Sequence, residues 1–362
     1  MNVLILTGRF GMGHYSAAHS IKEEIIKQGD NINVEVIDIV DYMLPKLNTI
    51  IYSSFDILVK RANRIYNYFY NHTMDSNYNP SIPLVNKFIS KIENLISKTK
   101  PDIVISTLPL CSRIMSEYKR KHNNSIPLVT CITDVSIHNE WISPHTNLYM
   151  VATKRVKANL IKNGVEPKDI IIAGIPVKAQ FKDRQGKRAR YYKKERTLLV
   201  MGGGLGIIPL EKDFYYKLSK ITNLKVIVIT GNNKKEYAKL SNKYDNIKVI
   251  GYTNKVHEYM VSADLIITKA GGITTFESIY SNLPLIILSP FLEQERNNAY
   301  FIEQNYIGEI AWDKSADIAS KVLSLISDDE KLITMQDNMD RIISDINDIS
   351  FLDIMERFNK AV

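Results

Sequence analysis

The first candidate for proton transfer is His14, which closes a glycine-rich turn near the N-terminus. The turn runs from Gly8 to Gly13 and follows the apolar run Val3–Leu6. A histidine at a helix start, beyond the carboxyl end of a strand, stands where open α/β sheets bind ligands. There it can accept a proton near neutral pH, and the helix N-terminus lowers its pKa. Two interpretations stay open: His14 is a general base, or it only closes the turn.

Polar residues also follow the strand-like run Leu128–Thr133. Asp134 comes directly after it, and His138 and Trp141 follow in TDVSIHNEW. These residues are expected near the same sheet edge as His14. Asp134 can orient a histidine or bind a hydroxyl; equally, it can be an N-cap in a loop.

A second glycine turn, Ala270-Gly271-Gly272, follows the apolar run Leu265–Thr268. We expect Thr274 or Thr275 to cap the helix after it, and a second strand to follow. This strand–turn–helix–strand order predicts a βαβ unit. In such a unit, bare backbone N–H groups and a helix N-terminus can hold a phosphate.

Charged side chains flank this second turn. Lys269 adds a positive charge, and Glu277, one turn into the helix, can accept hydrogen bonds from a sugar diol. The alternative is a structural βα turn with a surface lysine.

Two other stretches can contact an anionic sugar derivative. Gly202–Gly206 lacks the Lys-Ser/Thr of a P-loop, but the backbone of Gly203 and Gly204 can approach a diphosphate. Polar side chains that can grip sugar hydroxyls follow the run Leu285–Leu288; they are Gln294, Glu295 and Asn298.

The motifs of metal sites are missing from the sequence. There is no DxD pair, no HExxH and no Cys or His cluster with metal spacing. A diphosphate leaving group would then be stabilised by backbone groups, helix dipoles and Lys269. We therefore expect no metal or other cofactor.

Apolar, β-branched runs alternate with helix-like segments along most of the chain, which predicts parallel sheets covered on both faces. Six runs lie in each half: Val3–Leu6, Val34–Val40, Ile103–Ser106, Leu128–Thr133, Leu148–Val151 and Ile170–Ala173, then Thr197–Met201, Val226–Thr230, Ile247–Ile250, Leu265–Thr268, Leu285–Leu288 and Glu309–Ala311. Each series starts with a strand that enters a glycine turn. We expect two Rossmann-like domains.

The domain boundary is predicted at a basic stretch. Residues 181–196 contain eight Lys or Arg and separate domains at 1–180 and 197–340. Residues 42–82 contain no strand and interrupt the alternation of the first domain. Amphipathic helices are expected near the C-terminus. The last of them is predicted at residues 341–362.

Composition is that of a globular protein: 45% of the 362 residues are hydrophobic and 24% are charged. The N-terminal apolar run is expected to be a strand and not a signal peptide. Cys111 and Cys131 both lie beside strand-like runs, which suggests buried, reduced thiols. The net charge of +8 fits an anionic partner without choosing among nucleic acid, a membrane surface and a nucleotide.

Aromatic and basic residues crowd the segment between Tyr42 and Tyr70. Its apolar residues have helical spacing along one predicted face, and its basic residues lie away from that face. The residues singled out as a membrane or acceptor surface are Phe55, Lys60, Arg61, Arg64 and Phe69. Such a helix can lie in a membrane interface; alternatively, it packs on its own domain with a solvated basic face.

Together these motifs resemble the monogalactosyldiacylglycerol synthase and processive diacylglycerol glucosyltransferase family, relatives of MurG-type glycosyltransferases. The resemblance extends over nearly the whole chain. Its motifs are GxGHxxAA at 11–18, TDxxxHxxW at 133–141, AGIPV at 173–177, GGGLG at 202–206, KAGGxTxxE at 269–277 and QExxN at 294–298. One departure is Pro290-Phe291-Leu292 before the QExxN motif, where the family often has Pro-Gly-Gln-Glu.

The resemblance implies a GT-B fold, in which a C-terminal helix returns to an acceptor domain and the second domain binds a UDP-sugar. It implies that Glu277 holds the ribose and that Gly271, Gly272 and Thr274 hold the diphosphate. The loop at Tyr252 would face uracil, and the QExxN residues would face the hexose. His14 would be the base, with Asp134 and His138 nearby.

The implied reaction is inverting transfer of a hexose, glucose being preferred, from a UDP-sugar to diacylglycerol. The implied partners are the UDP-sugar, diacylglycerol and an anionic membrane surface, at the cytoplasmic face of the cell membrane. With a lipid acceptor, interfacial docking becomes the preferred interpretation of the aromatic segment. Two alternatives stay open: a MurG-like transfer of N-acetylglucosamine to a polyprenyl diphosphate, and a UDP-sugar sensor without activity. No recognition motif for nucleic acid is present.

Overall fold

The structure, a computed structural model, describes residues 1–29, 31–73, 85–136, 138–182, 194–203, 206, 208, 210–313, 317–347 and 349–359. Gly204 and most of the basic linker lie outside the described residues, as do the side chains of Lys60, Arg61 and Phe69. The chain forms two compact units. Unit 1 comprises Met1–Ala179, Leu292–Gln294 and Asp345–Val362, and unit 2 comprises Gln180–Phe291 and Glu295–Ser344.

Unit 1 is built on a six-stranded sheet of order β2-β1-β3-β4-β5-β6, in which all neighbours are parallel. Its strands are β1 (Asn2–Thr7), β2 (Asn33–Asp38), β3 (Ile103–Ser106), β4 (Leu128–Cys131), β5 (Leu148–Val151) and β6 (Ile170–Ile172). Its helices are α1 (Gly13–Gln28), α2 (Ile39–Met43), α3 (Asn48–Arg61), α4 (Asn63–Thr73), α5 (Val85–Thr99), α6 (Pro109–His122), α7 (Lys154–Lys162) and α16 (Phe351–Asn359).

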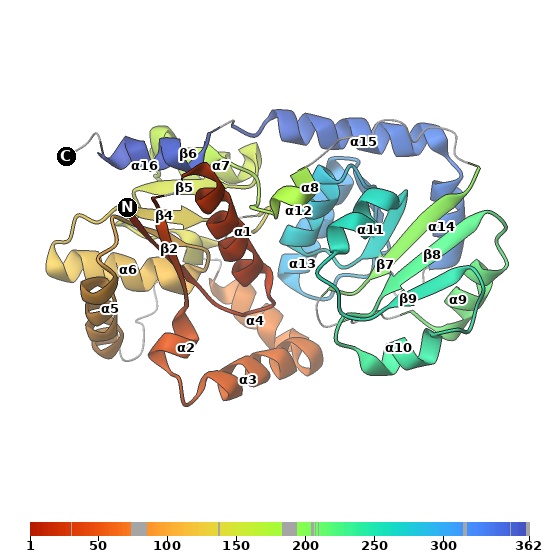
Figure 1. Cartoon of the computed structure of the whole chain (residues 1–362), viewed down its shortest axis with the longest axis horizontal. Coiled ribbons are helices and arrows are strands. Elements are labelled where there is room, and N and C mark those ends of the chain that lie inside the picture. Colours follow the sequence, from red (N-terminus) through yellow and green to blue (C-terminus); the bar gives the residue numbers. More distant parts are fainter. Residues whose placement is uncertain are drawn as a thin grey trace. The chain divides into compact units, whose positions relative to one another are not determined.

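Helices cover both faces of this sheet because side chains alternate along each strand. Val3 and Ile5 of β1 face a core that α1 and α16 share, whereas Leu4 and Leu6 face a core with α5 and α6. Figure 1 shows these two layers. Such strands, buried on both faces, explain the continuous apolar runs of the sequence.

Unit 2 repeats this plan with the parallel order β12-β11-β10-β7-β8-β9. Its strands are β7 (Arg196–Met201), β8 (Leu224–Ile229), β9 (Ile247–Ile250), β10 (Leu265–Thr268), β11 (Leu285–Ile287) and β12 (Gly308–Ile310). Its helices are α9 (Lys212–Ser219), α10 (Lys234–Leu240), α11 (Val256–Ser262), α12 (Gly272–Tyr280), α14 (Ile318–Ile326) and α15 (Asp329–Ser344). Two further helices span the boundary: α8 (Ala179–Lys182) and α13 (Glu293–Gln304), whose first two residues belong to unit 1.

The main core of unit 2 lies between its sheet and α9, α14 and α15. On the other face, α12 contributes the fully buried Phe276 and Ile279. The two doubly wound α/β sheets confirm the predicted fold class, and every predicted strand is present.

Three local predictions were wrong. Strand β2 ends at Asp38 instead of Val40, because the Asp38 carboxylate accepts the N–H groups of Val40 and Asp41 and starts α2. Helix α12 begins at Gly272 with Gly271 as N-cap, so Thr274 and Thr275 lie inside the helix.

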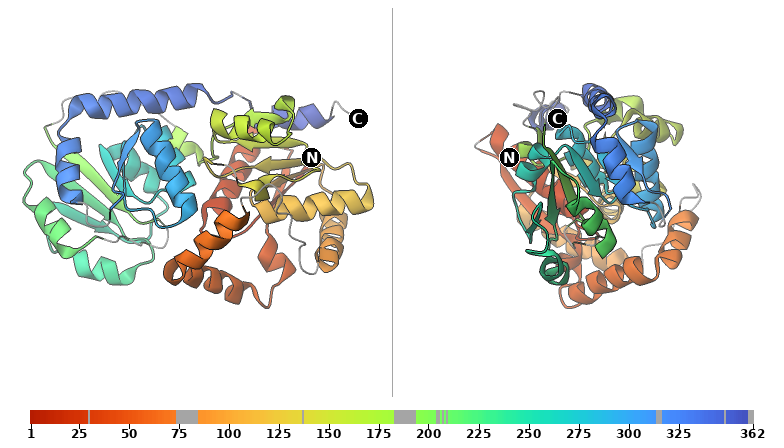
Figure 2. Two further views of the ribbon diagram at one scale, coloured as in Figure 1. Left: turned by 180° about the vertical axis from the view of Figure 1, so that it is seen from behind. Right: turned by 90° about the vertical axis from the view of Figure 1, so that its right-hand side faces the viewer.

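The third concerns the aromatic segment. The continuous helical face predicted there breaks at Ala62, which ends α3 before α4 begins. Figure 2 shows this helix pair in orange. In the part of the chain that the structure describes, no helix combines the length and apolar character needed to cross a bilayer.

Candidate active site

The strand order of unit 1 reverses between β1 and β3, and the loop that carries His14 lies at this point. Ligands of open α/β sheets bind at the carboxyl ends of strands where the order reverses. Thr107, just after β3, joins the two strand ends: its Oγ1 lies 2.8 Å from Thr7 Oγ1 and 3.0 Å from the His14 carbonyl oxygen. The carboxyl ends of β1 and β3 therefore hold the backbone of His14 in place through Thr107.

The turn itself has an unusual backbone. Gly11 and Met12 both have left-handed conformations, with φ of 74° and 65°. Residues other than glycine rarely adopt this backbone conformation, and Met12 does so at the N-cap of α1. Helix α1 begins at the next residue, Gly13, so His14 is its second residue, which confirms the predicted position of His14 at a helix start.

A hydroxyl orients the imidazole. Thr133, buried at the start of the loop after β4, places Oγ1 2.8 Å from His14 Nδ1, and the ring centre of Trp141 lies 5.9 Å from the imidazole centre. If Nδ1–H donates to Thr133, then Nε2 carries the lone pair and can accept a proton. The geometry thus suits a base that acts through Nε2.

Two opposing effects set the basicity of His14. Burial lowers its pKa below the ordinary value of 6.5, while the negative charge of Asp134 and a hydrogen bond to the Thr107 backbone raise it. Because burial dominates, the imidazole is neutral at neutral pH. Asp134 is itself 8% exposed, which strengthens its field on His14.

His138 is buried and occupied by other partners. Its Nδ1 accepts the Glu140 N–H at 3.2 Å as the N-cap of a short 3-10 turn, and its Nε2 lies 3.0 Å from the Tyr70 carbonyl oxygen. Its ring also packs on Tyr70 at 4.6 Å. These contacts tie α4 to the loop after β4, so the geometry favours a structural role for His138 over proton transfer.

In unit 2 the strand order reverses between β7 and β10, and both predicted glycine turns follow these two adjacent strands. Gly206, in the turn after β7, has φ of 60°, and a Cβ there would lie 1.7 Å from the Thr230 carbonyl oxygen. Only glycine fits. Asn233 holds the turn by donating from Nδ2 to the Gly206 carbonyl at 3.1 Å.

The turn after β10 leaves a helix N-terminus available to an anion. Helix α12, which the structure describes throughout, has neither a side-chain cap nor an acidic residue in its first turn. Asn298, almost fully buried on α13, supports the turn by donating to the Ala270 carbonyl at 2.9 Å. Thr275 Oγ1 bonds back to the Gly271 carbonyl at 2.8 Å and so stays inside the helix.

Lys269 stands at the entrance of this turn, with its ammonium group 4.8 Å from the centre of the Phe291 ring. Thr274 and Glu277 are partly buried on α12, and Glu295 is partly buried on α13. Tyr252, after β9, is 72% exposed, which leaves its ring open to a planar group. Unit 2 thus brings Gly203, Lys269, Gly271 and Gly272 to one sheet edge.

The comparisons with known proteins agree in both halves of the chain. A family profile described as monogalactosyldiacylglycerol (MGDG) synthase matches residues 14–177. Another, described as the glycosyltransferase family 28 C-terminal domain, matches residues 197–351. The processive diacylglycerol beta-glucosyltransferase of Bacillus licheniformis is 30% identical over 376 residues, covering 98% of this chain and 95% of that protein. The chain belongs to the MGDG synthase and processive diacylglycerol glucosyltransferase family.

Other relatives of the family agree. The enzyme of the same name from Staphylococcus aureus MRSA252 is 30% identical, covering 94% of this chain and 88% of that protein. Among solved structures, MurG of Acinetobacter baumannii aligns with a TM-score of 0.64 at 14% identity, covering 99% of each chain, which shows the fold alone. The chain is a glycosyltransferase with the GT-B fold, as the motifs implied.

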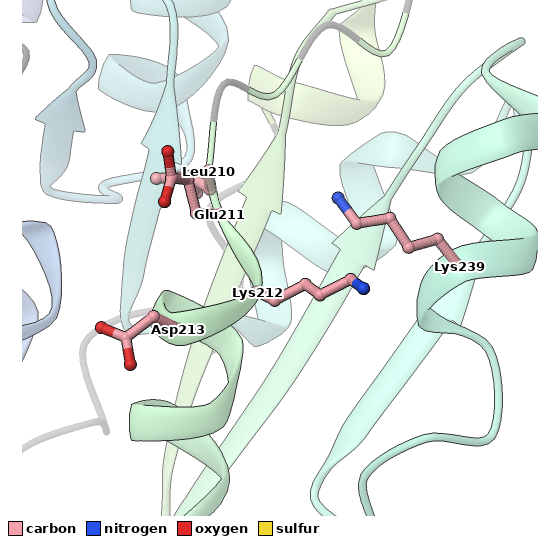
Figure 3. Close-up of a pocket in the computed structure, with 5 residues that line it drawn as sticks. All are labelled: Leu210, Glu211, Lys212, Asp213 and Lys239. Carbon is pink, nitrogen blue, oxygen red and sulfur yellow. The ribbon is translucent and has the colours of Figure 1, made fainter.

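One hollow of unit 2 lies apart from these turns. A hollow of about 580 Å³ is lined by Leu210, Glu211, Lys212, Asp213 and Lys239. In Figure 3 the ammonium groups of Lys212 and Lys239 face one another across it, while Glu211 and Asp213 point away. None of its lining residues belongs to a family motif.

The aromatic segment differs from its prediction in which side chains are outside. Phe55 is partly buried, with its ring 5.1 Å from Phe10 and 6.2 Å from Tyr66. Arg64 is exposed as predicted. The exposed apolar side chains are others: Leu47, Ile50, Ile57, Ile65 and Tyr68.

Sequence reasoning assigned no role to Thr133 or Thr107, although both touch His14. Thr133 could have been found from its position, since it directly precedes Asp134 at the end of a predicted strand. Nothing in the sequence points to Thr107, because its contact with the His14 backbone depends on the adjacency of β1 and β3.

Proposed function

We propose that the protein transfers a hexose, glucose in the first instance, from a UDP-sugar to the free hydroxyl of diacylglycerol. The observation that carries the proposal is the placement of His14 at the switch point of unit 1, oriented by Thr133 and tuned by Asp134, in a member of this family. The printed names of the curated relatives supply the acceptor and the sugar.

The proposed reaction is one displacement. Nε2 of His14 takes the proton of the acceptor hydroxyl while its oxygen attacks C1 of the sugar, and the bond from C1 to the diphosphate oxygen breaks. UDP leaves with the bonding electrons, so the configuration at C1 inverts. A neutral imidazole is required at the start, which is the state that burial favours.

The leaving diphosphate gains negative charge as the bond breaks. We assign its stabilisation to the backbone N–H groups at the start of α12, to the turn at Gly203 and to the ammonium group of Lys269. Among the described residues, no group of three or more His, Cys, Asp or Glu side chains is placed to hold a metal ion. That turnover needs no metal stays a prediction, which dialysis against EDTA before the assay tests.

The family motifs imply roles for the remaining donor residues: Glu277 accepts hydrogen bonds from the ribose, Tyr252 stacks on uracil, and Gln294, Glu295 and Asn298 contact the hexose. The side-chain amide of Gln294 donates to Asp134 in this structure. The exposure of the donor residues in α12, α13 and the loop after β9 is compatible with these roles for all but Asn298, which is 1% exposed. Asn298 therefore acts by holding the Ala270 carbonyl.

The test is to incubate the protein with diacylglycerol vesicles and UDP-glucose, UDP-galactose or UDP-N-acetylglucosamine in turn, and to identify the lipid products by mass spectrometry. Hexosyl-diacylglycerol from UDP-glucose supports the proposal. No glycolipid from any donor, or transfer of N-acetylglucosamine to an added polyprenyl diphosphate instead, would refute it.

We further propose that α3 and α4 seat unit 1 on an anionic membrane surface, as a peripheral protein. Ile50 and Ile57 are 62% and 56% exposed and lie two turns apart on α3; Ile65 and Tyr68 are 53% and 68% exposed and adjacent on one side of α4. Exposed apolar side chains beside Arg64, in a chain of net charge +8, suit a bilayer whose headgroups are negative. This set replaces Phe55 as the apolar part of the surface.

Docking is tested with Ile57→Glu and Arg64→Glu in vesicle sedimentation. Ile57→Glu should weaken binding to all vesicles, while Arg64→Glu should weaken it only where anionic lipid is present. Ile161→Glu, at another exposed isoleucine on α7 of the same unit, is the matched control. An equal loss of vesicle binding in the control, or no loss of binding in either variant, would contradict the docking assignment.

A further inference from the structure

Arg9, inside the glycine turn that carries His14, binds two carboxylates. Its Nε lies 3.0 Å from Asp38 Oδ2, and its Nη2 lies 2.5 Å from Asp41. Asp38 is buried at the start of α2 and Asp41 lies within that helix. The guanidinium therefore anchors the turn to the segment that leads into α3.

Tyr52 of α3 completes this connection. Its hydroxyl accepts the backbone N–H of Arg9 at 3.1 Å and donates to Asp38 Oδ1 at 2.6 Å. Its ring lies 4.8 Å below the Arg9 guanidinium carbon and 5.1 Å from the Phe10 ring. Phe55, one turn later on α3, also packs on Phe10, with the ring centres 5.1 Å apart.

A second link holds the beginning of α3 to the same carboxylate. Asn48, the first residue of α3, donates from Nδ2 to Asp41 Oδ1 at 2.8 Å. Four contacts, two from Arg9 and one each from Tyr52 and Asn48, thus converge on Asp38 and Asp41. A shift of α3 has to move the turn, because charge-assisted bonds to a buried carboxylate are costly to break.

The same helix has its other face outside. Ile50 and Ile57 are exposed, whereas Tyr52 and Phe55 point toward the turn. His14 lies four residues after Phe10 in the same stretch of chain. Because α3 has one face toward solvent and the other on this turn, a shift of the helix caused by contact at its exposed face can be transmitted to the turn.

We propose that Arg9 and Tyr52 are positioning residues that couple the seating of α3 on a bilayer to the placement of His14. The inference rests on the proposed function, since it requires a lipid acceptor. Through this coupling His14 adopts the position required for proton transfer when α3 contacts a bilayer that carries diacylglycerol. Neither side chain touches the reacting atoms.

The test variant is Tyr52→Phe, which removes the hydroxyl and keeps the ring packed on Phe10. Its matched control is Tyr42→Phe, which removes a single tyrosine bond, Oη to the Lys91 carbonyl at 3.2 Å, elsewhere in the same segment. Turnover is compared on diacylglycerol vesicles and on a soluble short-chain diacylglycerol. We expect the vesicle-to-soluble ratio of kcat to fall about 3- to 10-fold in Tyr52→Phe, as one lost hydrogen bond allows, and not in the control.

A readout without activity uses the two tryptophans of the chain. Trp312→Phe leaves Trp141, buried beside His14, as the only fluorophore of its kind. In this background, adding diacylglycerol vesicles should change the emission of Trp141. The Tyr52→Phe variant should lose this change in emission but still sediment with the vesicles. Asp41→Asn, on an exposed partner of Arg9, should act in the same direction if Tyr52→Phe does not fold.

Three results would overturn the inference: an unchanged kcat ratio and emission response in Tyr52→Phe, an equal fall on both acceptors, or loss of vesicle binding. The second would leave Tyr52 a purely structural residue, and the third would place it in the docking surface. If the unmutated protein makes no glycolipid at all, the proposed function fails, while the Trp141 response still decides the coupling.

Discussion

His14 has to be neutral to accept a proton and basic enough to hold it. Burial of the imidazole meets the first requirement and the charge of Asp134 meets the second. When Nδ1–H donates to Thr133 Oγ1, the lone pair that accepts the proton is on Nε2. These three effects act on one ring, and each can be removed separately.

Replacing Asp134 by Asn should move the acid limb of kcat/KM to lower pH. The Asp134 carboxylate stabilises the imidazolium and so raises the His14 pKa; without it, burial lowers the pKa further below 6.5. Since activity needs neutral His14, it is lost as pH falls through that pKa, and the loss comes later in the variant. The measurement is kcat/KM against pH, which reports the free enzyme.

Glu140→Gln is the control, because Glu140 lies by His138 and not by His14. Its acid limb should stay in place. An Asp134→Asn profile that matches the unmutated enzyme would mean that Asp134 does not act on the base.

At the residue scale, the sequence was sufficient for the position of His14 but not for its surroundings. The glycine turn predicts a histidine at a helix start from local chemistry alone. The bonds of Arg9 to Asp38 and of Thr107 to the His14 backbone join residues about thirty and ninety positions apart, and only the sheet order brings them together.

Among the elements, the two glycine turns after β7 and β10 are the part of unit 2 to which we assign the diphosphate. They follow adjacent parallel strands on either side of the point where the strand order reverses. The turn after β7 depends on Gly206, whose Cβ position is filled by the backbone of the neighbouring strand end.

Gly206→Ala should therefore reduce both stability and donor affinity more than Gly203→Ala does. Both glycines have positive φ, so each alanine costs about 1–2 kcal/mol of backbone strain. Only at Gly206 must Thr230 also move, whereas nothing lies within 4 Å of a Cβ at Gly203. Thermal midpoints and UDP titration calorimetry compare the pair; equal midpoints would contradict the structural account of this turn.

Element prediction succeeded for the strands because continuous apolar runs bounded by turns leave little choice. It failed at boundaries decided by individual side chains. Asp38 caps α2 inside a run that otherwise extends a strand, and α3 ends at Ala62 with neither glycine nor proline to announce it. Which face of α3 is outside depends on Phe10, from a distant turn, and spacing alone cannot show it.

In the whole molecule, chain order and unit membership differ at the C-terminus. Helix α15 belongs to unit 2, but α16 contributes Phe351, Ile354 and Met355 to the core of unit 1, which it shares with strands β1 and β2 from more than 300 residues earlier. Asn347 supports this return by exchanging hydrogen bonds with the Ile172 backbone at 2.8 and 2.9 Å. Helix α16 is thus part of the fold of unit 1.

Phe351→Ala should destabilise unit 1 by about 3–5 kcal/mol, the usual cost of emptying a buried phenylalanine site. Phe358→Ala, on the same helix but only partly buried, should cost less. Denaturant unfolding followed by Trp141 fluorescence, in the Trp312→Phe background, measures the difference. UDP binding should persist in both variants, and its loss would show that α16 serves unit 2 instead.

The central claim is that unit 1 supplies the base and unit 2 holds the donor, and His14→Gln tests it most directly. Single-turnover transfer from UDP-glucose to diacylglycerol is measured beside UDP-glucose affinity by calorimetry. The account predicts that transfer slows about 10²- to 10⁴-fold, the usual contribution of a general base, while donor affinity is unchanged. Transfer at the unmutated rate, or a matching loss of donor affinity, would contradict it.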